Sequence, residues 1–202
     1  MKIYLMRHGE TEWNKIRKFQ GQVDTPLAKE GILQAQKTSE GMKEIPFDCI
    51  FSSPLKRAYM TAQIIRGDRE IPLIRDNRLK EMSFGIYEGR RLAGFNKPGR
   101  VRAMRFRNDP VRYRPPKHGE TFEELIARTS GFIREEILPL EGKMDTILIT
   151  AHGAAVRSII LALTGRELKD FWNTPFGKNC STALFECENG QMKMIYENKI
   201  YY

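Results

Sequence analysis

Three short apolar runs in this 202-residue chain are each followed by a polar turn and then by a helical pattern. They lie at 2–6, 49–51 and 146–150, and continuous runs of this length are typical of buried strands. A further apolar piece lies at 73–74. Strands that alternate with helices predict a mostly parallel sheet, whose right-handed crossovers bring the carboxyl ends of the strands to one edge.

Local signals predict where several of these elements begin. A helix is expected over 53–65, with Ser53 as its N-cap and a proline at its first position. A Thr-x-x-Glu capping box opens another helix at Thr121. The pair Asn189-Gly190 is a strong signal for a two-residue hairpin near the end of the chain. The fold class is therefore α/β, a mostly parallel sheet with an antiparallel edge.

Length and composition predict a single domain over 1–202. With 41% hydrophobic residues the chain can bury a full core, and the only internal interruption is a Gly- and Pro-rich stretch at 84–120, which we interpret as an inserted lid. No apolar run approaches a membrane span and no signal-peptide pattern is visible, so we expect a soluble, cytoplasmic protein. Three cysteines without a CxxC pair predict neither disulfides nor a zinc ribbon, and we expect Cys49 and Cys187 to be core residues.

The net charge of +9 comes from one segment. Residues 90–117 contain ten basic residues and one acid, Asp109, and removing them from the chain's 34 basic and 25 acidic residues leaves 24 of each. Such a segment can attract an anionic substrate, bind nucleic acid, or be a solvated face. Its aromatic residues are too widely spaced for a base-stacking surface, and we expect no nucleic-acid partner.

Cations and histidines stand at the predicted strand ends. Arg7 and His8 follow the first strand, Arg57 follows the second and His152 follows the fourth. Each alone has an ordinary structural explanation, but the topology brings them to one edge of the sheet. A neutral imidazole is a nucleophile and arginines hold phosphate oxygens, so the group predicts phosphoryl transfer through His8. The remaining histidine, His118, lies in a Pro-rich loop, where we expect it to be exposed.

These motifs resemble the histidine phosphatase superfamily, which contains cofactor-dependent phosphoglycerate mutases and related phosphatases. The resemblance covers nearly the whole chain in the family's order. It rests on Arg7-His8-Gly9-Glu10-Thr11 with Trp13 and Asn14; Phe19-Gln20-Gly21-Gln22 and Asp24-Thr25-Pro26-Leu27; Ser52 to Ala58 with Thr61-Ala62; Leu79, Glu81, Phe84-Gly85 and Glu88-Gly89; Tyr113-Arg114-Pro115-Pro116 and Gly119-Glu120-Thr121; and Ala151-His152-Gly153 with Val156-Arg157.

The resemblance implies a three-layer α/β/α sandwich and assigns roles to individual residues. It implies that His8 becomes a phosphohistidine, that Arg7, Arg57 and His152 hold the phosphoryl oxygens, and that Glu81 is the acid and base. It also implies oxygen contacts from three further side chains, Asn14, Gln20 and Glu120. The Glu120 loop departs from the usual pattern, because His118 stands where many relatives have a glycine and Thr121 replaces a common serine.

Three functions fit these residues. A phosphomonoesterase acting on small phosphorylated metabolites is favoured over a phosphoglycerate mutase, since mutases of the family usually have a longer lid and a C-terminal tail. A catalytically inactive regulatory or RNA-binding module is the third, and the intact site residues argue against it. The excess of arginine in 94–117 points to a substrate with a second anionic group. We expect no metal and no other cofactor, because the histidines form no ligand cluster. The oligomeric state stays open, a homodimer included.

Overall fold

A computed structural model describes residues 1–91, 101–175 and 177–202. Its strands form one six-stranded sheet in the order β3-β2-β4-β1-β5-β6. The first four strands of the chain are parallel, whereas β5 runs antiparallel to β1 and β6 antiparallel to β5. This confirms the mostly parallel sheet with an antiparallel edge. The strands are β1 Lys2–Arg7, β2 Cys49–Ser52, β3 Leu73–Arg75, β4 Thr146–Ala151, β5 Thr182–Glu188 and β6 Gln191–Lys199.

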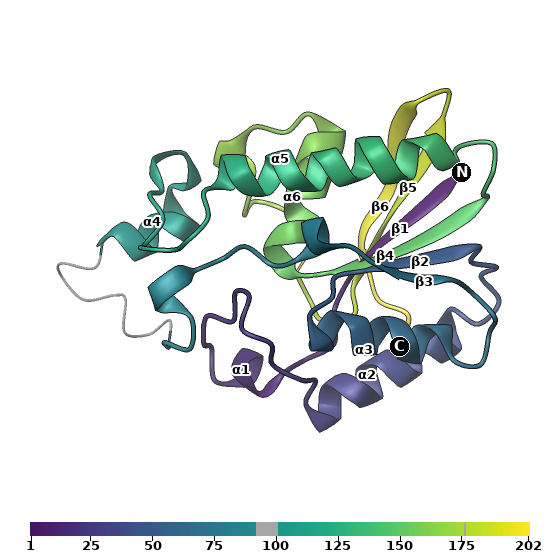
Figure 1. Cartoon of the computed structure of the whole chain (residues 1–202), viewed down its shortest axis with the longest axis horizontal. Coiled ribbons are helices and arrows are strands. Elements are labelled where there is room, and N and C mark those ends of the chain that lie inside the picture. Colours follow the sequence, from purple (N-terminus) through teal and green to yellow (C-terminus); the bar gives the residue numbers. More distant parts are fainter. Residues whose placement is uncertain (92–100, 176) are drawn as a thin grey trace.

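Helices cover both faces of the sheet and make the three layers of an α/β/α sandwich (Figure 1). In this view α5 and α6 lie above the sheet, and α2 and α3 lie below it. The short helices α1 and α4 lie to one side, beyond the ends of the strands. The helices are α1 Glu12–Lys15, α2 Lys29–Gly41, α3 Lys56–Arg66, α4 Val101–Asn108, α5 Phe122–Phe132 and α6 Gly153–Thr164.

Side chains alternate along the central strands and divide the core into two clusters. In β1, Ile3 and Leu5 belong to the larger cluster, which includes residues of α5 and α6. Tyr4 and Met6 belong to the smaller cluster, which includes residues of α3. Successive side chains of a strand point to opposite faces, so a strand with helices on both sides is apolar throughout. This is why the strands read as continuous apolar runs rather than as alternating patterns.

The helix after β2 begins later than the sequence predicts. Its first residue is Lys56, and Ser53 is not its N-cap. The Ser53 hydroxyl instead accepts a 3.3 Å hydrogen bond from the Leu55 N–H, in the turn before the helix. The predicted start of this helix was therefore wrong by two residues, because Leu55 and not Ser53 is the N-cap. Arg57 becomes the second residue of α3.

Other local predictions are confirmed. Thr121 and its capping-box glutamate make both reciprocal hydrogen bonds at the start of α5. Asn189 and Gly190 have φ angles of 51° and 73° between β5 and β6, as the favoured two-residue hairpin requires. Cys49 and Cys187 are buried in strands. His118 is exposed. No described helix has the length and apolar character that crossing a membrane requires.

The predicted lid, 84–120, packs partly into the main core. Phe84, Phe106 and Tyr113 are buried in the larger cluster together with residues of the sheet. Phe106 stacks on Phe122 of α5 at 5.6 Å between ring centroids. Lys97 and Arg100, two of the ten basic residues of 90–117, lie outside the described residues.

Candidate active site

His8 lies directly after β1, at the carboxyl end of the central strand, and only 2% of it is exposed. Its Nδ1 is 2.7 Å from the Gly9 carbonyl, which can only accept a hydrogen bond. Nδ1 therefore carries the proton, and Nε2 presents its lone pair. Burial lowers the pKa of His8 well below its usual value of 6.5, and the charges of Arg57 and Arg7 lower it further. The imidazole is a neutral base at physiological pH, as a nucleophile must be.

Two arginines reach the site from different strand ends and are both held by backbone carbonyls. Arg7 donates from Nη1 to the Gly177 carbonyl. Arg57 is 1% exposed and donates to the Val23 carbonyl at 2.8 Å and the Gly21 carbonyl at 2.6 Å. Burial lowers the pKa of Arg57 to about 10, so it stays charged at neutral pH. Arg57 is therefore not the exposed helix cation that its sequence position would suggest alone.

His152 is the fully buried N-cap of α6, and its ring centroid lies 5.1 Å from that of His8. Its Nε2 is 2.8 Å from the Ser53 hydroxyl. Because that hydroxyl already accepts from the Leu55 N–H, its own proton is available to His152 Nε2. We take the neutral ring to carry its proton on Nδ1, the tautomer in which the Ser53 hydroxyl donates to Nε2. Burial lowers the pKa of His152 well below 6.5, with nearby Arg57 and His8 adding to the effect.

Three buried donors in this group have no hydrogen-bond partner among the described residues. They are Nε of Arg7, Nε of Arg57 and Nδ1 of His152. Buried polar groups are almost always satisfied, and leaving one unpaired costs about 1–3 kcal/mol. We call Arg7, His8, Arg57 and His152 the strand-end cluster. A tetrahedral oxyanion beside His8 Nε2 would supply acceptors for all three donors.

Gln20 and Asn14 flank the same space, and both line the cavity in front of His8. The Gln20 Oε1 accepts from the hydroxyls of Thr11 at 2.9 Å and Thr25 at 2.8 Å, which leaves its amide N–H groups as donors. Asn14 accepts from the Thr11 N–H through Oδ1 as part of the capping box of α1. The oxygen contacts expected of these two amides are therefore compatible with their positions.

Glu81 reaches the cluster from the loop between β3 and the predicted lid. Both carboxylate oxygens lie 3.2 Å from the Ala154 N–H, and Oε1 also accepts from Ala155 at 3.2 Å and from Met82 at 2.9 Å. The carboxylate therefore caps the N-terminus of α6, as a negative group at the positive end of the helix dipole. It lines the cavity that His8 also lines.

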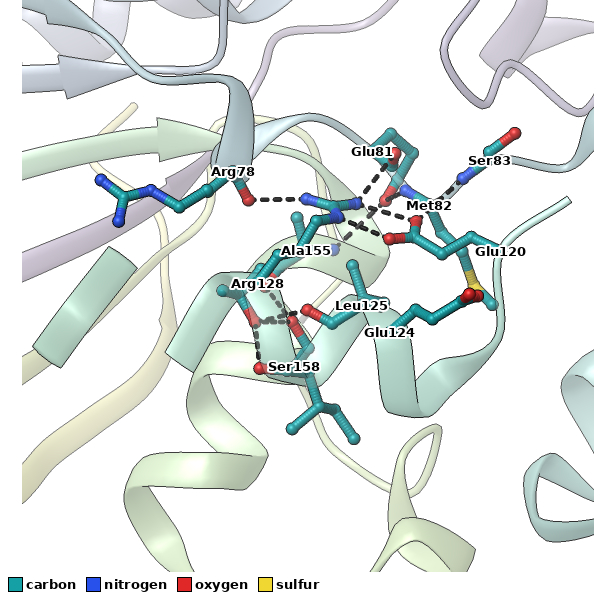
Figure 2. Close-up of polar contacts among 12 residues, drawn as sticks. Arg78, Glu81, Met82, Ser83, Glu120, Glu124, Leu125, Arg128, Ala155 and Ser158 are labelled. Carbon is teal, nitrogen blue, oxygen red and sulfur yellow. Dashed lines mark hydrogen bonds and ion pairs between the residues drawn. The ribbon is translucent and has the colours of Figure 1, made fainter. Parts of the chain in front are cut away.

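Glu120 does not line the cavity. Its carboxylate pairs with Arg128 at 2.6 Å and accepts from the Ser83 N–H at 3.2 Å (Figure 2). The structure therefore places Glu120 behind the Glu81 loop, whereas the other seven predicted site residues are in or beside the strand-end cluster. Arg128 has no signal in the sequence, since an arginine within an amphipathic helix is ordinary.

The cavity in front of His8 has a volume of about 350 Å³. Arg7, His8 and Arg57 line it, whereas His152 does not. Its described wall contains three further cations, Lys18, Arg107 and Arg157, and Glu81 is the only carboxylate of that wall. Arg107 belongs to the basic segment 90–117. Arg157 donates to Thr174 at 2.8 Å and stacks on Trp172, and burial lowers its pKa to about 10. The described residues contain no group of three or more side chains able to hold a metal ion.

The two buried histidines predict a pH-dependent stability. The pKa values of His8 and His152 are lowered in the folded chain, whereas in the unfolded chain they are about 6.5. Between about pH 5 and 6.5 the unfolded chain therefore binds more protons, so the free energy of unfolding should rise as the pH increases, by up to about 2.7 kcal/mol per pH unit, and should be lost again on acidification. Urea unfolding at intervals from pH 5 to 7.5 measures this slope. The slope should flatten in His8→Asn/His152→Asn, and an unchanged slope there would contradict the assignment.

The chain is similar to known proteins over nearly its whole length. The model of the histidine phosphatase superfamily (branch 1) matches residues 3–199. The putative phosphoserine phosphatase 2 of Hydrogenobacter thermophilus is 31% identical over 98% of this chain and 96% of its own length. The 2,3-bisphosphoglycerate-dependent phosphoglycerate mutase of Chlamydia muridarum is 30% identical, with 80% and 83% covered. The structure of YhfR from Bacillus stearothermophilus superposes with a TM-score of 0.92 at 30% identity, covering 98% and 97% of the two chains.

Proposed function

Because this chain belongs to the histidine phosphatase superfamily, we propose that it is a phosphatase of small phosphorylated metabolites and that its reaction passes through a phosphohistidine at His8. The observation that carries the proposal is the set of unpaired buried donors around the His8 imidazole. A phosphoryl group spreads negative charge over three equatorial oxygens, and preorganised donors stabilise that charge most strongly where water is excluded.

The reaction has two steps. His8 Nε2 attacks phosphorus, the bond from phosphorus to the alcohol oxygen breaks, and Glu81, which enters this step as the protonated carboxylic acid, gives its proton to the departing alkoxide. Water then attacks the phosphohistidine, the bond from phosphorus to nitrogen breaks, and Glu81 takes the proton of the water. Arg7, Arg57 and His152 hold the phosphoryl oxygens in both steps, with Asn14 and Gln20 as further donors.

We expect activity to be independent of metal ions. The positive charge of Arg7 and Arg57 offsets the charge of the phosphoryl group, which is the task that Mg²⁺ performs in many other phosphoryl-transfer sites. Dialysis against EDTA should leave kcat unchanged in assays of phosphate release. Loss of activity in EDTA that a divalent cation restores would contradict this mechanism.

The cations of the outer wall favour a substrate whose leaving group carries a second negative charge. Lys18, Arg107 and Arg157 line the cavity beyond the strand-end cluster. The matched pair 3-phosphoglycerate and glycerol 3-phosphate differs only in whether a carboxylate or a neutral carbinol group is present. We expect a higher kcat/KM for 3-phosphoglycerate, and Arg157→Gln should reduce the difference. Equal values for the two substrates in the unchanged protein would contradict the preference.

A phosphoglycerate mutase is the second candidate, because the chain is similar to one over most of its length. A mutase returns the phosphoryl group to the other hydroxyl, whereas a phosphatase transfers it to water. Incubation with 3-phosphoglycerate and a trace of 2,3-bisphosphoglycerate separates the two. Release of inorganic phosphate is the expected result, and formation of 2-phosphoglycerate without phosphate release would favour the mutase.

A further inference from the structure

We propose that Arg128, paired with Glu120, is a positioning residue that fixes the loop carrying Glu81 and so sets the geometry of proton transfer. The inference rests on the proposed function, because it takes Glu81 as the general acid and base. Neither Arg128 nor Glu120 touches the cavity that His8 lines. Their effect on the reaction is therefore indirect, and their hydrogen bonds point to the loop that carries Glu81 as its route.

The guanidinium of Arg128 binds two backbone carbonyls of the loop that carries Glu81 (Figure 2). Nη1 donates to the Arg78 carbonyl at 2.6 Å, and Nη2 donates to the Glu81 carbonyl at 3.1 Å. Two carbonyls three residues apart are thereby tied to one rigid, planar group on α5. One of these two carbonyls belongs to Glu81 itself.

Glu120 completes the arrangement. It accepts from Arg128 Nε at 2.6 Å and Nη2 at 3.0 Å, a bidentate pair, and from the Ser83 N–H at 3.2 Å. The side chains are 20% and 13% exposed, so the pair is partly shielded from water. The loop is therefore held before Glu81 by Arg128 and after it by Glu120.

The carboxylate of Glu81 is fixed by a different element, the N-terminus of α6. The loop thus bridges two helices, with its backbone on α5 and its carboxylate on α6. If the backbone anchor is removed, the hydrogen bonds to α6 alone must define where Glu81 lies. General acid catalysis requires the donor within hydrogen-bond reach of the leaving oxygen, so a small shift of the loop lowers the rate.

Leaving-group dependence separates a positioning role from a merely structural one. The value of kcat/KM reports steps up to departure of the alcohol, and p-nitrophenolate is stable enough to leave without a proton, whereas an alkoxide is not. For Arg128→Met we expect kcat/KM for 3-phosphoglycerate to fall about 10–100-fold, and that for p-nitrophenyl phosphate to fall about threefold or less. Arg128→Lys, which keeps the charge but not the fork, should lie between Arg128→Met and the unchanged protein. Glu120→Gln should show the same selectivity with a smaller loss.

Glu81→Gln provides the reference, and Arg78→Met is the matched control. The Arg78 side chain pairs with Asp76, Glu135 and Glu136 nearby. Its loss should therefore lower kcat/KM for 3-phosphoglycerate and for p-nitrophenyl phosphate by the same factor. If Glu81→Gln lacks the leaving-group selectivity, the proposed role of Glu81 fails, and the inference with it. The other outcome is that Glu81→Gln shows the selectivity, whereas Arg128→Met and Glu120→Gln are folded and have kcat/KM lowered equally for both substrates. In that case only the inference about Arg128 is overturned.

Discussion

His8→Ala should lower kcat by about 10⁴-fold or more, because the nucleophile of a covalent mechanism has no substitute within reach. The fold should survive. The only hydrogen bond of the His8 side chain in the described structure goes to the carbonyl of the next residue, and His8 belongs to neither apolar cluster. We therefore expect the free energy of unfolding to change by no more than about 1–2 kcal/mol.

The covalent intermediate gives a direct measurement. The unchanged protein quenched during turnover should carry a phosphoryl group on His8 that is labile in acid and stable in alkali, and His8→Ala should carry none. His118→Asn is the control, since His118 is exposed at φ 62°, a conformation that Asn tolerates, and should keep both activity and label. A phosphoryl group on any other residue, or an active His8→Ala, would exclude the phosphohistidine. Unfolding of His8→Ala would instead mean that the histidine is structural.

The sheet and its order along the chain could be predicted because buried parallel strands are apolar on both faces. The runs at 49–51 and 146–150 have no polar alternation, and helices cover both sides of each strand in the structure. The start of α3 could not be predicted. Ser53 has the chemistry of an N-cap, but its hydroxyl is engaged by His152, 99 residues away in the sequence. A tertiary contact here outweighs a local preference.

The strand-end cluster follows from topology, since parallel strands bring Arg7, Arg57 and His152 to one edge of the sheet. The position of Glu81 does not follow, because it lies in an irregular loop whose path depends on packing between α5 and α6. Only the family resemblance singled it out. Neither the topology nor the family resemblance predicts the pairing of Glu120 with Arg128. The sequence does not show how α5 is oriented toward the loop or which arginine faces it.

Arg57→Lys should lower kcat/KM by about 10²–10³-fold, although it conserves charge. Arg57 holds the carbonyls of Gly21 and Val23 with its two terminal nitrogens, while Nε remains without a partner in the described structure. A lysine has a single nitrogen and cannot reach two carbonyls and a phosphoryl oxygen together. It must either release the 20–25 loop, which carries Gln20, or leave the substrate without a donor. Inhibition by orthovanadate, which resembles the five-coordinate transition state, should weaken in parallel.

Arg66→Lys is the matched control, because Arg66 lies ten residues from the cavity end of the same helix and does not line the cavity. It should keep kcat/KM and vanadate inhibition, so that any loss in Arg57→Lys reports on the site and not on α3. If Arg57→Lys retained full activity, a single positive charge would be sufficient at this position. The forked geometry, and the inference that Nε of Arg57 in the cavity wall binds a phosphoryl oxygen, would then be wrong.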